Sequence, residues 1–195
     1  SGDYAPAEQA LRSGIPLARA AGARRYLSAM LYSLAQVKLA AGARREARAH
    51  LDEALTLAQQ TGMAFAGPMI LSGIACVEED PALAKRALEQ GEAVLRKPCI
   101  SHSCLHFYCN AIDVSLQWRD WDGALRYARA LEDYVHAEPL PWATLLIERA
   151  RALAVNGSGK HSDASLHELR RIRAEFERIG IRSALPRIDL ALSSR

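Results

Sequence analysis

The feature that most constrains the fold of this chain is a pattern that returns about every 40 residues. In most units a small residue is followed four positions later by Leu or Ala. The small residue itself comes shortly after Gly or Asp residues that favour turns. The leading residues are Ala7, Ala47, Ala84, Ala124 and Ala164, at intervals of 40, 37, 40 and 40 residues. Gly and Asp at such positions end one helix and cap the next. The spacing therefore predicts a series of repeated helical units.

The segments between the turns have the period of an α-helix. Leu31, Leu34, Ala35 and Leu39 recur at intervals of three and four, which places them on one helix face. The pattern predicts helices at 6–21, 24–41, 43–61, 63–78, 81–96, 101–118, 121–136, 141–155, 162–179 and 184–193. Short helix pairs cannot bury their apolar faces alone, whereas stacked pairs can. We therefore predict an all-α solenoid of antiparallel helix pairs.

A chain of 195 residues is long enough to form this solenoid as a single domain, 1–195. The expected helix pairs lie near 1–22, 23–62, 63–98, 99–138 and 139–180, and a capping helix follows at 183–193.

Composition narrows the class of protein further. Half of the residues are apolar and a quarter are charged, which argues against disorder. The net charge of +3 is too small for a dedicated nucleic-acid binder. No apolar run reaches membrane-spanning length, the start has no signal-peptide pattern, and four cysteines make no disulfide framework. We therefore expect a cytoplasmic protein without a membrane partner. Because the chain has no initiator Met, we also expect it to be a fragment.

Two segments resemble tetratricopeptide repeats. The first carries Leu34, Ala35, Lys38, Gly42, Ala47, Leu51 and Ala54, and the second is the run 118–128 with Asp120 and Trp121 before its Ala. The resemblance implies a right-handed superhelix of helix pairs with a concave binding surface. The period departs from the family, whose repeats have about 34 residues, and the Pro at the repeat end is mostly missing.

A second resemblance covers residues 75–193. It rests on Cys99-Ile-Ser-His102, Phe107-Tyr108, Asp120-Trp121-Asp122, Glu138-Pro-Leu-Pro-Trp142, Arg149 to Leu153 and Leu185-Pro186. This order is similar to the C-terminal repeat region of bacterial adenylate/guanylate cyclase-type proteins with a P-loop ATPase domain. The resemblance implies that the catalytic domains lie upstream. The chain alone would then be no enzyme, and would serve signal transduction as a regulatory scaffold.

The tetratricopeptide register predicts which side chains line the concave surface. The candidates are Tyr32, Gln36, His102, His106, Cys109, Asp113, Trp142 and Arg149. Such a mixture of aromatic, imidazole and charged groups suits an extended peptide or a neighbouring domain. The other interpretation of Tyr32 and Trp142 is packing between helices, because large aromatic residues are mostly buried.

Two motifs suggest a ligand, but only weakly. His102 and His106 are one helical turn apart and could share a zinc ion, yet Cys109 lies too far along the axis and Cys104 points elsewhere. The run 156–162 resembles a phosphate loop but lacks its first Gly and the Ser or Thr after Lys160. We expect no metal and no cofactor, and interpret 156–162 as a turn.

The C-terminal arginines are interspersed with glutamates. Glu168 with Arg171 and Glu175 with Arg178 have helical pair spacing, which predicts a solvated face with ion pairs. Nucleic-acid contact is the weaker alternative.

Two functions remain from different classes. The first is a protein-interaction module that binds a peptide, an upstream domain or, as a homodimer, a second copy. The alternative is a ligand- or metal-sensing helical domain of a transcriptional regulator. The sequence identifies no catalytic residue.

Overall fold

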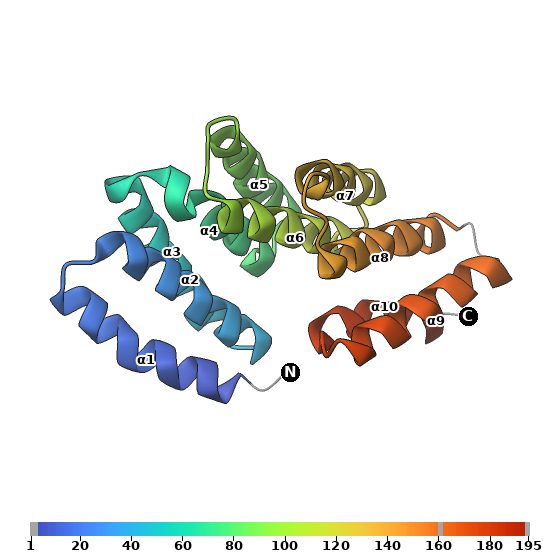
Figure 1. Cartoon of the computed structure of the whole chain (residues 1–195), viewed down its shortest axis with the longest axis horizontal. Coiled ribbons are helices and arrows are strands. Elements are labelled where there is room, and N and C mark those ends of the chain that lie inside the picture. Colours follow the sequence, from blue (N-terminus) through green and yellow to red (C-terminus); the bar gives the residue numbers. More distant parts are fainter. Residues whose placement is uncertain (1–3, 160–161, 194–195) are drawn as a thin grey trace. The chain divides into compact units, whose positions relative to one another are not determined.

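The computed structural model describes residues 4–159 and 162–193, and within them the chain is helical without strands (Figure 1). The helices are α1 (Ala5–Ala20), α2 (Arg24–Ala40), α3 (Arg44–Thr61), α4 (Met63–Val77), α5 (Pro81–Leu95), α6 (Ser101–Gln117), α7 (Trp121–Val135), α8 (Pro141–Gly157), α9 (Asp163–Arg178), the short 3₁₀ helix η1 (Arg182–Ala184) and α10 (Leu185–Ser193). Every predicted helix is present, with ends within two residues of the prediction. The all-α prediction is therefore confirmed.

The described residues form two compact units, 4–110 and 111–193. We call them the N-terminal and the C-terminal unit. The division falls inside α6, which contributes its first part to one unit and its last part to the other. Helices α1 to α5 pack in sequence in the N-terminal unit, and α7, α8 and α9 do so in the C-terminal unit, as expected for a helical repeat. The expectation of one continuous repeat domain stays a prediction.

Helix α4 is the centre of the N-terminal unit. Its sequence contains no charged residue, and residues 66–75 are all buried. A helix that is apolar on every side must be covered on every side. Helices α3 and α5 pack against α4, and α2 packs against it as well. The contact between α2 and α4 brings together the first helices of two successive pairs.

In the C-terminal unit α7, α8 and α9 pack in sequence, and α10 packs on both α8 and α9. Fully buried apolar side chains from each helix make its core: Leu131, Ala150, Leu169, Ile172, Phe176 and Ile188. The last helix thus covers the apolar faces that α8 and α9 leave open.

Turns between the helices use the capping chemistry that the sequence predicted. Asp80 accepts a hydrogen bond from the Ala82 amide at 2.7 Å, and Asp120 accepts one from the Gly123 amide at 2.9 Å. Both satisfy donors at a helix N-terminus. Where helices end, Gly22 and Gly42 adopt the left-handed conformation with φ of 64° and 78°.

Arg119 occupies the same kind of position between α6 and α7. Its φ is 56°, and it is the one described residue other than glycine with a positive φ. The Asp120 amide donates to the Ser115 carbonyl at 2.9 Å, and the Ala43 amide donates to the Lys38 carbonyl in the same way beside Gly42. This bond pattern favours glycine at its left-handed residue. Arg119 thus adopts a conformation that a side chain makes unfavourable.

None of the described helices combines the length and the apolar character that a membrane span requires.

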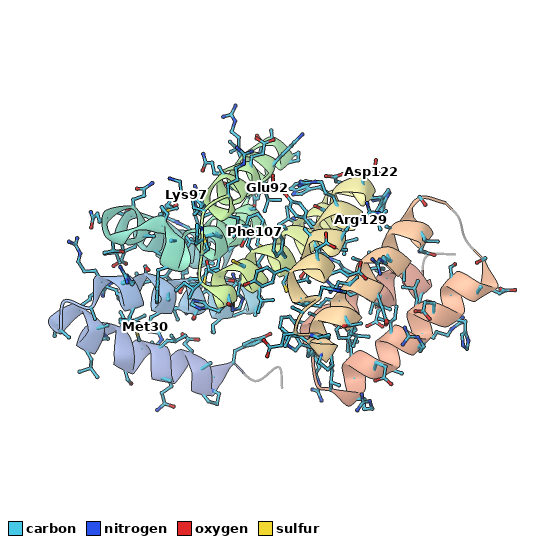
Figure 2. The ribbon with its side chains drawn as sticks, turned by 45° about the horizontal axis from the view of Figure 1, so that its top comes forward. Met30, Glu92, Lys97, Phe107, Asp122 and Arg129 are labelled. Carbon is cyan, nitrogen blue, oxygen red and sulfur yellow. The ribbon has the colours of Figure 1, made fainter. Side chains whose placement is uncertain are left out.

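A pair of helix glycines provides a test of this packing. A Cβ at Gly91 would overlap the Phe107 ring, which is fully buried on α6 (Figure 2), whereas a Cβ at Gly14 would meet only the flexible end of Met30, 2.6 Å from Cε. We expect Gly91→Ala to lower the free energy of unfolding by about 1–3 kcal/mol, because the ring has no room to move. Gly14→Ala should raise it by about 0.5–1 kcal/mol, because Ala favours a helix interior.

Urea denaturation of both variants measures these changes. Equal effects of the two substitutions would contradict the assignment of Phe107 to a rigid core.

Candidate functional site

The predicted concave residues are divided between the two units. Tyr32, Gln36, His102, His106 and Cys109 belong to the N-terminal unit, and Asp113, Trp142 and Arg149 belong to the C-terminal unit. The two groups are therefore two separate candidate surfaces.

Tyr32 on α2 is a packing residue with 2% exposure. Its hydroxyl accepts a hydrogen bond from Asn110 Nδ2 at 3.1 Å, and the same amide donates to Ser72 Oγ at 3.0 Å. Its ring lies against α4 where Gly73 has no side chain: a Cβ there would be 3.0 Å from Tyr32 Cε2. Burial raises the pKa of the Tyr32 hydroxyl. The expectation that Tyr32 is exposed on the concave surface is thus corrected, and the packing interpretation holds.

Rings from α2, α4 and α6 meet edge to face at the surface of the N-terminal unit. Tyr26 lies 5.5 Å from Phe65, and Phe65 lies 5.8 Å from His102, between ring centroids. The Arg25 guanidinium lies 5.6 Å from the centre of the Phe65 ring. Deeper in the unit, the His106 ring lies 5.4 Å from the ring of the buried Tyr32. Contacts of this geometry are favourable for aromatic rings and for a cation over a ring.

These side chains form one accessible surface, which we call the aromatic–histidine face. It consists of Arg25, Tyr26, Phe65, His102 and His106. Tyr26 is 64% exposed, and both histidines are exposed. Loss of hydration beside neighbouring protein atoms nevertheless lowers the pKa of His106, and the charge of His102 lowers it further. The tetratricopeptide register predicted both histidines as surface residues. It did not include Tyr26 and Phe65, which lie in the first turns of α2 and α4.

Carboxylates are missing from the helix segments that carry this face. Neither α2 nor α4 contains Asp or Glu, and residues 101–110 of α6 contain none. The acidic residues gather on the second helices of the pairs, such as Glu46 and Glu53 on α3. Arg24 and Arg25 open α2, and the N-terminal end of a helix carries a partial positive charge. The face therefore has a positive electrostatic character.

The other two candidates in the N-terminal unit, Gln36 and Cys109, lie further along α2 and α6 than the residues of the face. Gln36 is half-buried, and its Nε2 has no hydrogen-bond partner among the described residues. Cys109 is half-buried as well. No disulfide joins any of the four cysteines.

Arg149 is the central polar group of the C-terminal unit. The side chain is buried, donates to the Asp113 carboxylate, and reaches the Ala184 carbonyl at 3.5 Å. Its guanidinium lies 6.0 Å from the centre of the Phe176 ring. The expectation that Arg149 lines an exposed surface is corrected, because the buried Arg149 side chain joins α6, α8, α9 and η1 inside this unit. Trp142 is half-buried and lines a shallow cavity of about 610 Å³ between α8 and α9.

The weaker ligand motifs were the histidine pair of α6 and the run 156–162. Within the described residues, no three His, Cys, Asp or Glu side chains are grouped to hold a metal ion. Residues 156–159 of the proposed phosphate loop end α8 and turn, while Lys160 and His161 lie outside the described residues. The predicted ion pairs of α9 are confirmed: Arg171 contacts Glu168, and Arg178 contacts Glu175.

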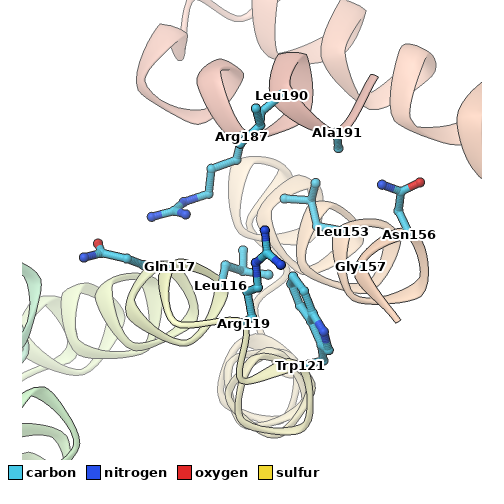
Figure 3. Close-up of a pocket in the computed structure, with 10 residues that line it drawn as sticks. All are labelled: Leu116, Gln117, Arg119, Trp121, Leu153, Asn156, Gly157, Arg187, Leu190 and Ala191. Carbon is cyan, nitrogen blue, oxygen red and sulfur yellow. The ribbon is translucent and has the colours of Figure 1, made fainter. Parts of the chain in front are cut away.

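A second candidate site lies in the C-terminal unit, and the sequence-based predictions did not include it. A cavity of about 480 Å³ opens between the end of α6, the start of α7, the end of α8 and α10 (Figure 3). Arg119 and Arg187 extend into it from opposite walls, with Trp121 beside Arg119. The apolar part of the lining comes from Leu116, Leu153 and Leu190. A signal was present, since an arginine stands at a turn position where the chain has glycine after α1, α2 and α9.

Comparisons with known proteins give no match: no family model, no curated protein and no solved structure matches this chain.

Removing either partner of the Asp113–Arg149 ion pair should lower the free energy of unfolding, but by different amounts. The Asp113 side chain is 44% exposed, whereas that of Arg149 is 3% exposed. Asp113→Ala leaves a buried cation without its carboxylate, which costs about 3 kcal/mol of unfolding free energy. Arg149→Met leaves a carboxylate that water can solvate, and we expect a loss of about 1 kcal/mol. Chemical denaturation of both variants tests this order, and a larger loss in Arg149→Met would contradict it.

Proposed function

We propose that this chain is a helical-repeat interaction module whose aromatic–histidine face binds an acidic, extended peptide segment of a partner protein. One observation carries the proposal: edge-to-face rings from α2, α4 and α6 form an exposed surface, and neither α2, α4 nor residues 101–110 of α6 contain a carboxylate. Aromatic and arginine side chains are the groups that contribute most to binding interfaces. An extended segment can contact several parallel helices at once.

The sign of the partner's charge follows from the position of the face. Tyr26, Phe65 and His102 lie in the first turns of α2, α4 and α6, and none of these turns contains an acidic residue. The positive charge of Arg25 is therefore not offset by a carboxylate within these turns. A carboxylate of the partner would be attracted here, while a lysine would be repelled.

The fold supports the same class of protein. Helix pairs of this size resemble tetratricopeptide repeats at residues 34–54 and 118–128, and in such repeats the first helices of the pairs line the binding surface. The right-handed superhelix of that family stays part of the proposal.

The proposal also includes the place of this chain within a larger protein. Residues 75–193 resemble the C-terminal repeat region of cyclase-type signalling proteins, which supports a regulatory role beside upstream cyclase and P-loop ATPase domains. The complete reading frame tests this part. A frame that encodes neither domain would remove it and would leave the peptide-binding proposal intact.

Peptide binding can be measured by fluorescence anisotropy with the full chain. The probe is a labelled peptide of glutamate, phenylalanine and glycine, and its counterpart carries lysine in place of glutamate. We expect the acidic peptide to bind more tightly, with an affinity that falls as salt is added. Arg25→Glu should weaken binding by roughly tenfold, because it places a like charge beside the peptide, and His102→Ala should weaken it less.

Arg45→Glu is the matched control, because Arg45 is also exposed but lies on α3 outside the face. It changes the net charge by the same amount and should alter the affinity by less than about twofold. Equal binding of the two peptides, or equal losses in Arg25→Glu and Arg45→Glu, would overturn the proposal.

A further inference from the structure

The cavity of the C-terminal unit has an unusual charge composition. Arg119 and Arg187 line it together with the polar side chains of Gln117 and Asn156, and its described lining contains no carboxylate (Figure 3). The lining therefore places two positive charges around a space of about 480 Å³.

Arg119 provides a second, independent observation. The position requires the left-handed conformation, with φ of 56°, that Gly42 and Gly180 supply in equivalent helix ends of this chain. An arginine is unfavourable there, because its Cβ approaches the backbone. Unfavourable backbone conformations that persist are concentrated at functional sites. The strain is consistent with a need for the guanidinium at this point.

We infer that this cavity binds a small organic phosphate that carries a flat, apolar ring. Two guanidinium groups from opposite walls match a doubly charged group with three oxygens, whereas one bidentate arginine already satisfies a carboxylate. The ring of the ligand would lie among Trp121, Leu116 and Leu153, which form the apolar wall. A space of this volume is typical of small-molecule sites with a few convergent polar groups.

The site goes beyond the proposed peptide-binding face. It lies in the other unit and uses different side chains, so the two proposals can fail separately. The ligand would contact α6, α7, α8 and α10 together, and its binding would stabilise the packing of α10 by mass action.

Isothermal titration calorimetry on the full chain tests the inference with simple probes. Phenyl phosphate supplies ring and phosphate together, phenol supplies only the ring, inorganic phosphate only the anion, and benzoate a ring with a carboxylate. We expect phenyl phosphate to bind most tightly and phenol not to bind measurably. Binding of phenol as tight as phenyl phosphate would overturn the role of the arginines, and tighter binding of benzoate would overturn the assignment to a phosphate.

Substitutions separate binding from folding. Arg119→Gly should weaken phenyl phosphate binding by roughly tenfold, since a charge-assisted hydrogen bond is lost. The same variant should raise Tm by about 2–4 °C, because glycine removes the backbone strain. Arg187→Gln should weaken binding to a similar extent.

Arg129→Ala is the control, because Arg129 is exposed on α7 and does not line the cavity. It should leave the affinity unchanged. A loss of affinity in Arg129→Ala equal to that in Arg119→Gly would overturn the site, as would an Arg119→Gly variant that binds phenyl phosphate like the wild type. Loss of both stability and binding in Arg119→Gly would equally overturn it, because the arginine would then be structural.

Discussion

Helix α4 presents apolar or small side chains around its whole circumference, and residues 66–75 are all buried. Such a helix is stable in water only when neighbours cover every side. Because α3 and α5 cover two sides of α4, its remaining side is covered by α2 and by the first part of α6. The hydrogen bonds from Asn110 to Tyr32 and Ser72 show α2, α4 and α6 meeting at one point. The exposed ring contacts follow from this packing, since the first turns of the same three helices are brought together.

Charge is distributed according to the same constraint. Helices α2 and α4 and the first part of α6 contain no carboxylate, whereas α3, which also packs against α4, places Glu46 and Glu53 where solvent reaches them. Burying a carboxylate without a partner is costly, so the acidic residues stay on the outer helices. The positive character of the aromatic–histidine face is thus partly a product of folding. What folding does not require is the exposure of Tyr26, which solvent contacts over 64% of its surface.

The sequence predicted the helices well and the site only in part. Turn glycines and capping residues such as Asp80 and Asp120 act locally, so they define helix ends without knowledge of the tertiary structure. The side chains of Tyr32 and Arg149 were misplaced because their burial depends on distant residues. Tyr32 is accommodated by Gly73, 41 positions away (73 − 32), and Arg149 is held by Asp113, 36 positions away. A helical period shows that a residue faces the protein, but it does not show whether a neighbouring helix leaves room for it.

Arg119 illustrates how local and tertiary information combine. The left-handed backbone directly after α6 favours glycine, but the chain has Arg119 there. At the comparable positions after α1, α2 and α9 it has glycine. A departure from a local rule carries a cost unless something else compensates for it. The described lining of the cavity that Arg119 enters contains no carboxylate that could supply this compensation. The turn itself is already secured by Asp120, which caps α7 whichever residue precedes it. A ligand anion that completes the environment of Arg119 would account for both the charge of the cavity and the conformation of the turn.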